Sequence, residues 1–289
     1  SLTDAATGIR YAHGRGVRTL LAINTYPQPS GEERWQRAID AAADLGIDAV
    51  ILADAGLMRY AARTYPSLPI HLSVQASATS YEAINFYYEH FGVTRAILPR
   101  VLSVAQIEQV CRNTSVEIEV FGFGSLCVMV EGRCTLSSYV TGESPNTHGA
   151  CSPAAAVRWT QTAAALESRL NGVLVDRYAE SEKAAYPTLC KGRYEVEQQT
   201  YYAIEEPASL NALELLPSLA RIGVVAVKIE GRQRNAAYTA QVTRIWRAAL
   251  DACGISRENY AVEPEWDLAL RKLSEGQKQT LGAYSRPWK

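Results

Sequence analysis

Short apolar runs alternate with amphipathic segments through the first half of the chain, and this alternation constrains the fold most. Residues 48–54 form one such run, which is typical of a strand buried on both faces of a parallel sheet. The preceding segment 33–46 places its apolar residues on one helical face and ends at Gly46. Because such units follow one another with short connections, the sequence predicts a parallel sheet with right-handed crossovers.

The pattern predicts seven strands and eight helices. The strands are expected at 18–24, 48–54, 70–75, 94–99, 116–122, 201–206 and 224–230. The helices are expected at 3–13, 33–46, 56–64, 81–91, 104–113, 154–164, 210–222 and 235–253. This count is one strand short of a (β/α)8 TIM-like barrel, and the chain opens on a helix. A missing leading strand explains both facts, whether the chain is truncated at its start or the barrel is open there.

The alternation stops after Gly122 and resumes near residue 201, which defines an insertion at 123–200. It leaves from the sixth strand of such a barrel if a leading strand is counted. Residues 1–253 are therefore expected to form a (β/α) barrel with this insertion, and residues 254–289 a C-terminal extension packed on the barrel. A stretch this long without regular structure is expected either to have a function or to be held in place by a cross-link.

Four cysteines of the insertion supply a candidate metal-based cross-link, and three of them lie in polar, glycine-rich surroundings. The four are Cys127, Cys134, Cys151 and Cys190. The other two, Cys111 and Cys253, fall within predicted helices and are assigned to packing. In a reducing compartment such a set is more often metal-binding or catalytic than disulfide-bonded.

The spacing of the four cysteines bears on which metal they bind. Structural zinc sites favour closely spaced CxxC pairs, and the sequence contains none. Wide, irregular spacing suits an iron–sulfur cluster, although all-thiolate ligation suits both metals. The residues alone therefore favour iron–sulfur over zinc and leave zinc as an alternative.

Composition and known motifs exclude several classes of function. The net charge of −1 and the pI near 6.4 give no general attraction to nucleic acid. No run approaches the roughly 18 apolar residues of a transmembrane segment, and the N-terminus is no signal peptide, so a cytoplasmic enzyme is expected. HExxH, GxSxG, P-loop and complete GxGxxG motifs are absent from the sequence.

Polar residues end several of the predicted strands, and in a (β/α) barrel these ends form the active-site face. The candidate catalytic residues there are Arg100, Glu119, Glu230 and Arg232. Guanidinium groups offer paired donors to carboxylates, so a small anion is the expected guest, with Lys191 and Arg193 adding positive charge. The alternative is that Glu230 and Arg232 only cap and bridge the last barrel turn. Other strand-end residues on this face are Asn24, Asp54 and Gln75.

A longer signature surrounds the first two cysteines. It reads EVFGFGSLC at 119–127 and GRCTLS at 132–137, and it is accompanied by SVQAS at 73, ILPRVLS at 97, YPTLCKGRY at 186 and VKIEGRQR at 227. Together these segments resemble the collagenase-like peptidase family U. Within the family, the similarity is to a subunit that acts in oxygen-independent ubiquinone biosynthesis.

That resemblance implies properties that spacing does not show. Such a protein would bind a [4Fe-4S] cluster through Cys127, Cys134, Cys151 and Cys190 and would pair with a homologous subunit, UbiV. The pair would hydroxylate the aromatic ring of ubiquinone precursors, with prephenate as hydroxyl donor and an accessory lipid-binding protein delivering the precursor. Relatives that hydroxylate RNA, and a peptidase-like hydrolase with structural zinc, are the alternatives.

Overall fold

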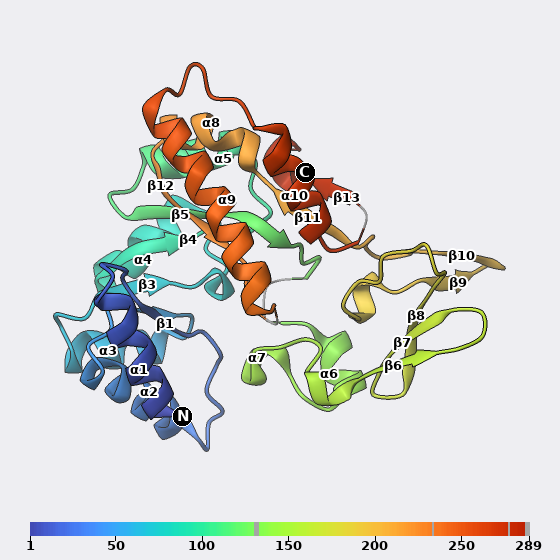
Figure 1. The fold of residues 1–289 in the computed structure, drawn as a ribbon. Coiled ribbons are helices and arrows are strands. Elements are labelled where there is room, and N and C mark those ends of the chain that lie inside the picture. The colour runs from blue at the N-terminus through green and yellow to red at the C-terminus, as the bar shows by residue number, and fades with distance from the viewer. Residues whose placement is uncertain (130–132, 233, 277, 287–289) are drawn as a thin grey trace.

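A computed structural model describes residues 1–129, 133–232, 234–276 and 278–286. Its centre is a sheet of six parallel strands in the order β1-β2-β3-β4-β5-β12 (Figure 1). The strands are β1 Leu20–Ile23, β2 Ala49–Leu52, β3 Ile70–Leu72, β4 Val93–Ile97, β5 Glu117–Ser125 and β12 Val224–Ile229. The predicted α/β class with a parallel sheet is confirmed.

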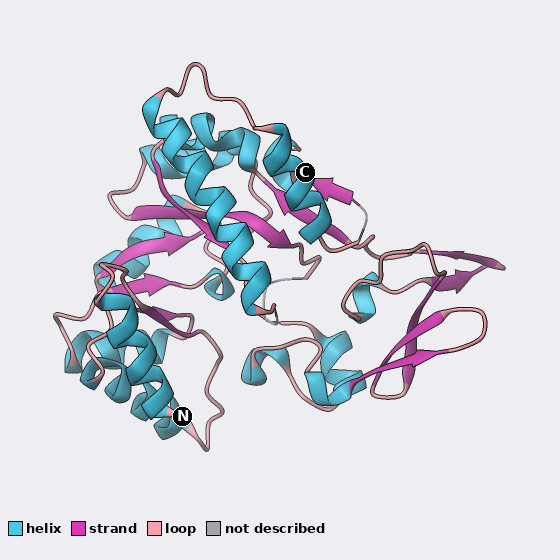
Figure 2. Ribbon diagram, viewed as in Figure 1, coloured by secondary structure: helices cyan, strands magenta, loops and turns pink. Residues whose placement is uncertain are grey.

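Helices connect the parallel strands and cover the sheet (Figure 2). They are α1 Leu2–His13, α2 Glu32–Asp44, α3 Ala55–Thr64, α4 Tyr81–Phe91, α5 Val104–Arg112, α8 Leu216–Arg221, α9 Ala236–Ile255 and α10 Pro264–Leu273. Among the described residues, none of these helices is long and apolar enough to cross a membrane.

The apolar faces predicted from the sequence make the core. Trp35, Ile39 and Ala42 are the buried residues of α2, and they repeat at the spacing of one helical face. Each residue of β2 is buried, as a central parallel strand requires. Helix α4 spans the predicted residues and ends at Gly92, whose left-handed φ of 67° closes the C-terminus without the steric cost of a side chain.

The described strands do not close into a barrel. A closed barrel requires every strand to pair on both sides, but β1 pairs only with β2 and β12 only with β5. The second half of β5 instead takes an antiparallel partner, β11 (Ala208–Asn211), which is bordered by β13 (Lys278–Thr280). The expected eight-stranded ring is thus an open parallel sheet with an antiparallel extension, and the C-terminal segment supplies one of its strands.

The insertion after β5 has its own secondary structure. Its elements are α6 Thr135–Thr141, α7 Pro145–His148, an antiparallel sheet of β6 Val157–Gln161, β7 Leu166–Leu170 and β8 Val173–Tyr178, and a hairpin of β9 Tyr194–Val196 and β10 Gln199–Tyr201. It lies to one side of the parallel sheet (Figure 1).

Two predicted elements in and beyond the insertion were wrong, and a third was correct only in its second half. The helix at 154–164 is a single 3-10 turn followed by β6, because β-forming Val157, Trp159 and Thr160 pair with β7 and override the neighbouring alanines. The strand at 201–206 is instead the end of β10 and a loop. The helix at 210–222 is β11 followed by α8, where Pro217 occupies the first turn and costs no hydrogen bond.

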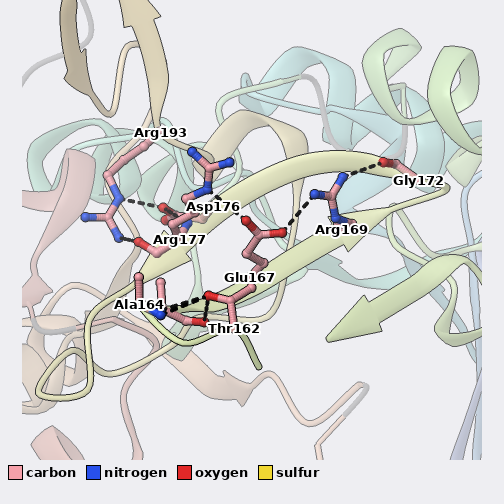
Figure 3. Close-up of polar contacts among 9 residues, drawn as sticks. Thr162, Ala164, Glu167, Arg169, Gly172, Asp176, Arg177 and Arg193 are labelled. Atoms are coloured by element: carbon pink, nitrogen blue, oxygen red, sulfur yellow. Dashed lines mark hydrogen bonds and ion pairs between the residues drawn. The ribbon is translucent and has the colours of Figure 1, made fainter. Parts of the chain in front are cut away.

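Polar contacts hold the insertion together. The Arg193 guanidinium bonds both Asp176, with an Nε–Oδ1 distance of 2.5 Å, and Glu182. Glu167 accepts from Arg169 on the same strand, β7, and from Arg177 on the neighbouring strand β8 (Figure 3). These ion pairs therefore connect β7, β8 and the segment 182–193 within the insertion.

Candidate functional site

A cavity of about 180 Å³ opens at the carboxyl edge of the parallel sheet, where β5 and β12 end. All four cysteines of the insertion line it, together with Arg100, Glu230 and Arg232. Since the carboxyl ends of parallel strands are where ligands bind in α/β proteins, this cavity is the candidate functional site. Its lining is cationic, with Lys191 and Arg234 adding to the two arginines.

The four cysteines reach the cavity from separate parts of the insertion. Cys127 follows the end of β5, and Cys134 stands immediately before α6. Cys151 follows α7, which ends at Gly149 with a left-handed φ of 79°. Cys190 lies in a 3-10 turn near the hairpin. Gly132, which the sequence placed in a tight turn before Cys134, lies outside the described residues.

The environment of Cys151 and Cys190 favours the neutral thiol by raising the pKa of each. Burial raises the pKa of Cys151 to about 11, and the proximity of Cys190, Cys127 and Cys134 adds to the increase. Burial also raises the pKa of Cys190. Thiolates are the form that ligates metal, so binding here would release protons.

The donor set fits an iron–sulfur cluster. Four thiols are the usual ligands of such clusters, and the cavity that they share has room between them. Within the described ranges, no three His, Cys, Asp or Glu side chains converge on a position for a single metal ion.

Arg100 and Glu230 meet at the cavity, as the sequence predicted. The Arg100 guanidinium lies 3.5 Å from the centroid of the Phe121 ring, and its Nη2 is 3.3 Å from Glu230 Oε2. Gly124, with a φ of 140°, makes room for this pair, because a Cβ there would lie 2.5 Å from Glu230 Cβ. The carboxylate and the aromatic ring together fix the direction of the guanidinium.

Arg232 connects the loop after β12 to the insertion. Its Nη1 donates to the Gly149 carbonyl at 2.6 Å and its Nη2 to Asn24 Oδ1 at 3.4 Å. The guanidinium therefore bridges the end of β1 and the turn before Cys151. A role in capping the loop and a role at the cavity are both compatible with this position.

Other residues predicted for the site lie elsewhere. Glu119 is buried within the sheet, where its carboxylate bonds Lys228 at 2.9 Å and Arg95 at 3.4 Å. Asp54 caps α3 by accepting from the Leu57 amide. Arg193 belongs to the ion pairs of the insertion. The Gln75 carbonyl accepts from Tyr26, and the Gln75 side chain is buried.

Sequence reasoning assigned no role to several lining residues, including Arg234, Ser125 and Glu275. Arg234 lies over the Tyr238 ring at 5.1 Å and is the last residue of the strand-end run 228–234. Ser125 is part of the signature but had no role assigned. Glu275 comes from the C-terminal segment and forms an ion pair with Lys191. No local pattern marks Glu275, because its place in the cavity depends on how the chain end folds back.

The fold and cavity define an α/β protein with a four-cysteine site at the carboxyl edge of its sheet. The chain belongs to peptidase family U32, whose family model matches residues 1–286. The resemblance to the collagenase-like family is thereby confirmed.

Named relatives in this family have different activities. The chain is 31% identical to tRNA hydroxylation protein P of Escherichia coli over 293 residues, which cover 93% of this chain and 63% of the relative. It is 29% identical to the 23S rRNA 5-hydroxycytidine C2501 synthase of Escherichia coli, covering 87% of this chain and 33% of that enzyme. It is 27% identical to a collagenase of Porphyromonas gingivalis, covering 88% and 56% respectively.

A solved U32 peptidase, Mk0906, aligns with 42% of this chain and 52% of its own at 19% identity and a TM-score of 0.36. The chain thus spans less than two thirds of the length of the curated relatives named above.

Proposed function

We propose that this chain is the iron–sulfur subunit of an oxygen-independent hydroxylase that acts on the aromatic ring of ubiquinone precursors, a subunit of the UbiU type. The observation that carries the proposal is the convergence of Cys127, Cys134, Cys151 and Cys190 on one cavity at the carboxyl edge of the sheet. Relatives named for hydroxylation of RNA support a hydroxylase role in the family.

In this proposal the four cysteines hold a [4Fe-4S] cluster. A cluster bound there would carry electrons, with a potential set by its charge, ligation and exposure. The cationic lining of the cavity would offset the negative charge of a thiolate-bound group. The thiols lie beside cations in a cavity at the strand ends. This position supports a cofactor that takes part in the reaction over a metal that only stabilises the insertion.

Arg100 and Arg232 are the proposed carboxylate-binding groups for prephenate, a dicarboxylate. Glu230 orients Arg100 through their ion pair. The guanidinium is thus held by two contacts, one with the Glu230 carboxylate and one with the Phe121 ring. Arg234 adds a third cation to the same wall of the cavity. Glu119 does not line the cavity, so its contribution would be to order Lys228 and Arg95 in the sheet.

The reaction must balance in electrons as well as atoms. When a ring carbon gains hydroxide in place of hydrogen, an electron pair and a proton leave the ring. An electron acceptor of the assembled enzyme has to take up that pair.

A homologous UbiV-like subunit is the proposed partner, and a lipid-binding accessory protein is proposed to deliver the apolar precursor.

Hydroxylation of RNA is the second candidate, favoured by the names of the relatives. The near-neutral charge of this chain argues for a small substrate instead, because RNA binding depends on neutralising phosphates. A peptidase-like hydrolase with structural zinc is a third candidate, motivated by the collagenase relative. None of the four histidines lines the described cavity, which leaves it without the usual general base of a hydrolase.

The test is a Cys134→Ala variant in cells grown without oxygen, with Cys111→Ala as the control because Cys111 packs beside the core, away from the cavity. We expect ubiquinone to be lost in the first variant and normal in the second. Normal ubiquinone in Cys134→Ala cells, together with loss of hydroxylated nucleosides from tRNA or rRNA, would assign the chain to RNA instead.

Three measurements on purified protein refine this test. Iron and acid-labile sulfide should be present after purification without oxygen, whereas one zinc per chain without sulfide would contradict the cluster. A Cys134→Ala chain that folds, binds its partner subunit and retains activity would reduce the metal to a structural role. Full hydroxylation and unchanged prephenate binding in Arg232→Ala would remove Arg232 from the proposal.

A further inference from the structure

A dehydrated ion pair lies in the wall of the cysteine cavity. Lys191 Nζ is 2.8 Å from Glu275 Oε2, and the two side chains are only 4% and 3% exposed. The same carboxylate oxygen accepts from Ser125 Oγ at 2.5 Å. Removing two charges from water is costly, so contacts of this kind stabilise a specific arrangement more than they stabilise the fold.

Both donors to Glu275 adjoin proposed cluster ligands. Lys191 directly follows Cys190, and Ser125 stands two residues before Cys127. One carboxylate oxygen therefore joins two cysteine-bearing segments that are far apart in the sequence. The relative position of these two segments depends on a residue of the C-terminal segment.

Glu275 also contacts the point where the insertion leaves the sheet and returns to it. Its backbone amide donates to Ser209 Oγ at 2.7 Å, and Ser209 pairs with Ser125 between β11 and β5. The two ends of the insertion are thus fixed to each other and to Glu275.

We propose that Glu275 and Lys191 are positioning residues for the group held by the cysteines. Glu275 sets the separation of Cys127 and Cys190 through Ser125 and Lys191, and the two opposite charges balance each other beside the cluster. This inference rests on the proposed iron–sulfur function. It adds that the C-terminal segment takes part in tuning the cofactor.

The charges of Glu275 and Lys191 predict shifts in the midpoint potential of the cluster. A purely structural cross-link would not cause such shifts. Glu275→Gln keeps the shape and leaves the Lys191 ammonium uncompensated, which stabilises the more negative, reduced cluster and raises its midpoint potential. Lys191→Met leaves the carboxylate uncompensated and lowers the potential. The double variant removes both charges and should return the potential toward the wild-type value.

The experiment uses the full chain with its partner subunit, purified without oxygen. Iron and sulfide per chain are measured first, and the midpoint potential is then measured by a redox titration followed by EPR. Glu206→Gln is the matched control, because Glu206 and Lys278 form an ion pair between the same two regions but are 45% and 66% exposed. We expect the control to match wild type in both measurements.

Opposite potential shifts in the two single variants, with restoration in the double variant, support the proposal. Loss of iron from Glu275→Gln, with normal iron in the control, supports the positioning role even where a potential cannot be measured. Unchanged potentials, or shifts of the same sign, in variants with normal iron overturn this inference and leave the proposed function standing. Wild-type protein without iron or sulfide overturns both.

Discussion

The parallel sheet and its helices share one apolar cluster, which includes residues from β1 to α10. Ile39 of α2, Leu52 of β2 and Leu57 of α3 belong to it. In the insertion, the buried members of the separate apolar cluster are Leu170, Val175 and Leu189. The sheet therefore has a core of the kind that folds a domain, and the insertion has only a small one. Small apolar cores are usually supplemented by metals, disulfides or ion pairs, and the described cysteines form no disulfide.

The difference shows where the cavity gets its shape. One wall is built on rigid strand ends, and the other on segments whose order depends on polar contacts and on whatever the thiols bind. We infer that Glu230 and Phe121 hold Arg100 in place with or without a cofactor. The insertion should depend on the cofactor for its stability.

Removal of the proposed iron–sulfur cluster should have the largest effect. Anaerobic chelation should open the insertion, so limited proteolysis within residues 126–207 should accelerate about a thousandfold, equivalent to about 4 kcal/mol of local stability. Cleavage within the sheet should change little. Cys111→Ala protein treated in the same way is the control for thiol handling. Cleavage that begins in the sheet would contradict the comparison.

Matched core truncations should separate the two regions. Leu57 and Leu170 are both fully buried, so the two alanine variants remove similar apolar area. We expect Leu57→Ala to lower the global free energy of unfolding by about 3 kcal/mol. Leu170→Ala should leave global denaturant unfolding nearly unchanged and should increase amide hydrogen exchange in β7 and β8. Equal global losses would mean that the two regions unfold as one unit.

Breaking the principal ion pair of the insertion should have the next largest effect. Arg193→Ala leaves the Asp176 side chain, only 1% exposed, without its guanidinium partner. Because Arg193 itself is partly exposed and water can enter, we expect a local loss of about 2 kcal/mol, measured by hydrogen exchange in β8. Arg169→Ala is the control, since its partner Glu167 keeps a second bond from Arg177. Equal effects of the two variants would contradict a special role for Arg193.

Exposed ion pairs should contribute least in both regions. Arg247 pairs with Asp251 on α9 with side chains 63% and 61% exposed, and Arg177 of the insertion is likewise 63% exposed. We expect Asp251→Asn and Arg177→Ala each to change stability by less than about 0.5 kcal/mol in thermal melts. A larger loss for Arg177→Ala would show that surface charge, and not the buried pair, orders the insertion.

The regular part of the fold was predictable because its signals are local. Helix α4 matched its predicted range, and β2 lay within its predicted run, since both follow periodicity and end signals that neighbouring residues carry. The barrel was not predictable in the same way. Closure depends on which strands become neighbours, and the choice of β11 as partner of β5 has no local signature.

The site was partly predictable for the same reason. Arg100, Glu230 and Arg232 follow strand ends, and the parallel topology alone brings strand ends together. Glu119 was misplaced because it lies inside β5, which continues to Ser125 and not to Gly122 as predicted. Glu275 was missed because its approach to Lys191 depends on β13 joining the sheet.

The pairing of Ser125 with Ser209 also has a meaning for how this family can change. Because the two ends of the insertion lie side by side, its length affects the closure entropy only logarithmically. Segments between these residues can be lengthened, shortened or replaced without moving the strands that bear Arg100 and Glu230. The insertion can therefore vary as one unit, while the strand ends beside it keep their positions. A change confined to the insertion would then alter one wall of the cavity and leave the contact between Arg100 and Glu230 in place.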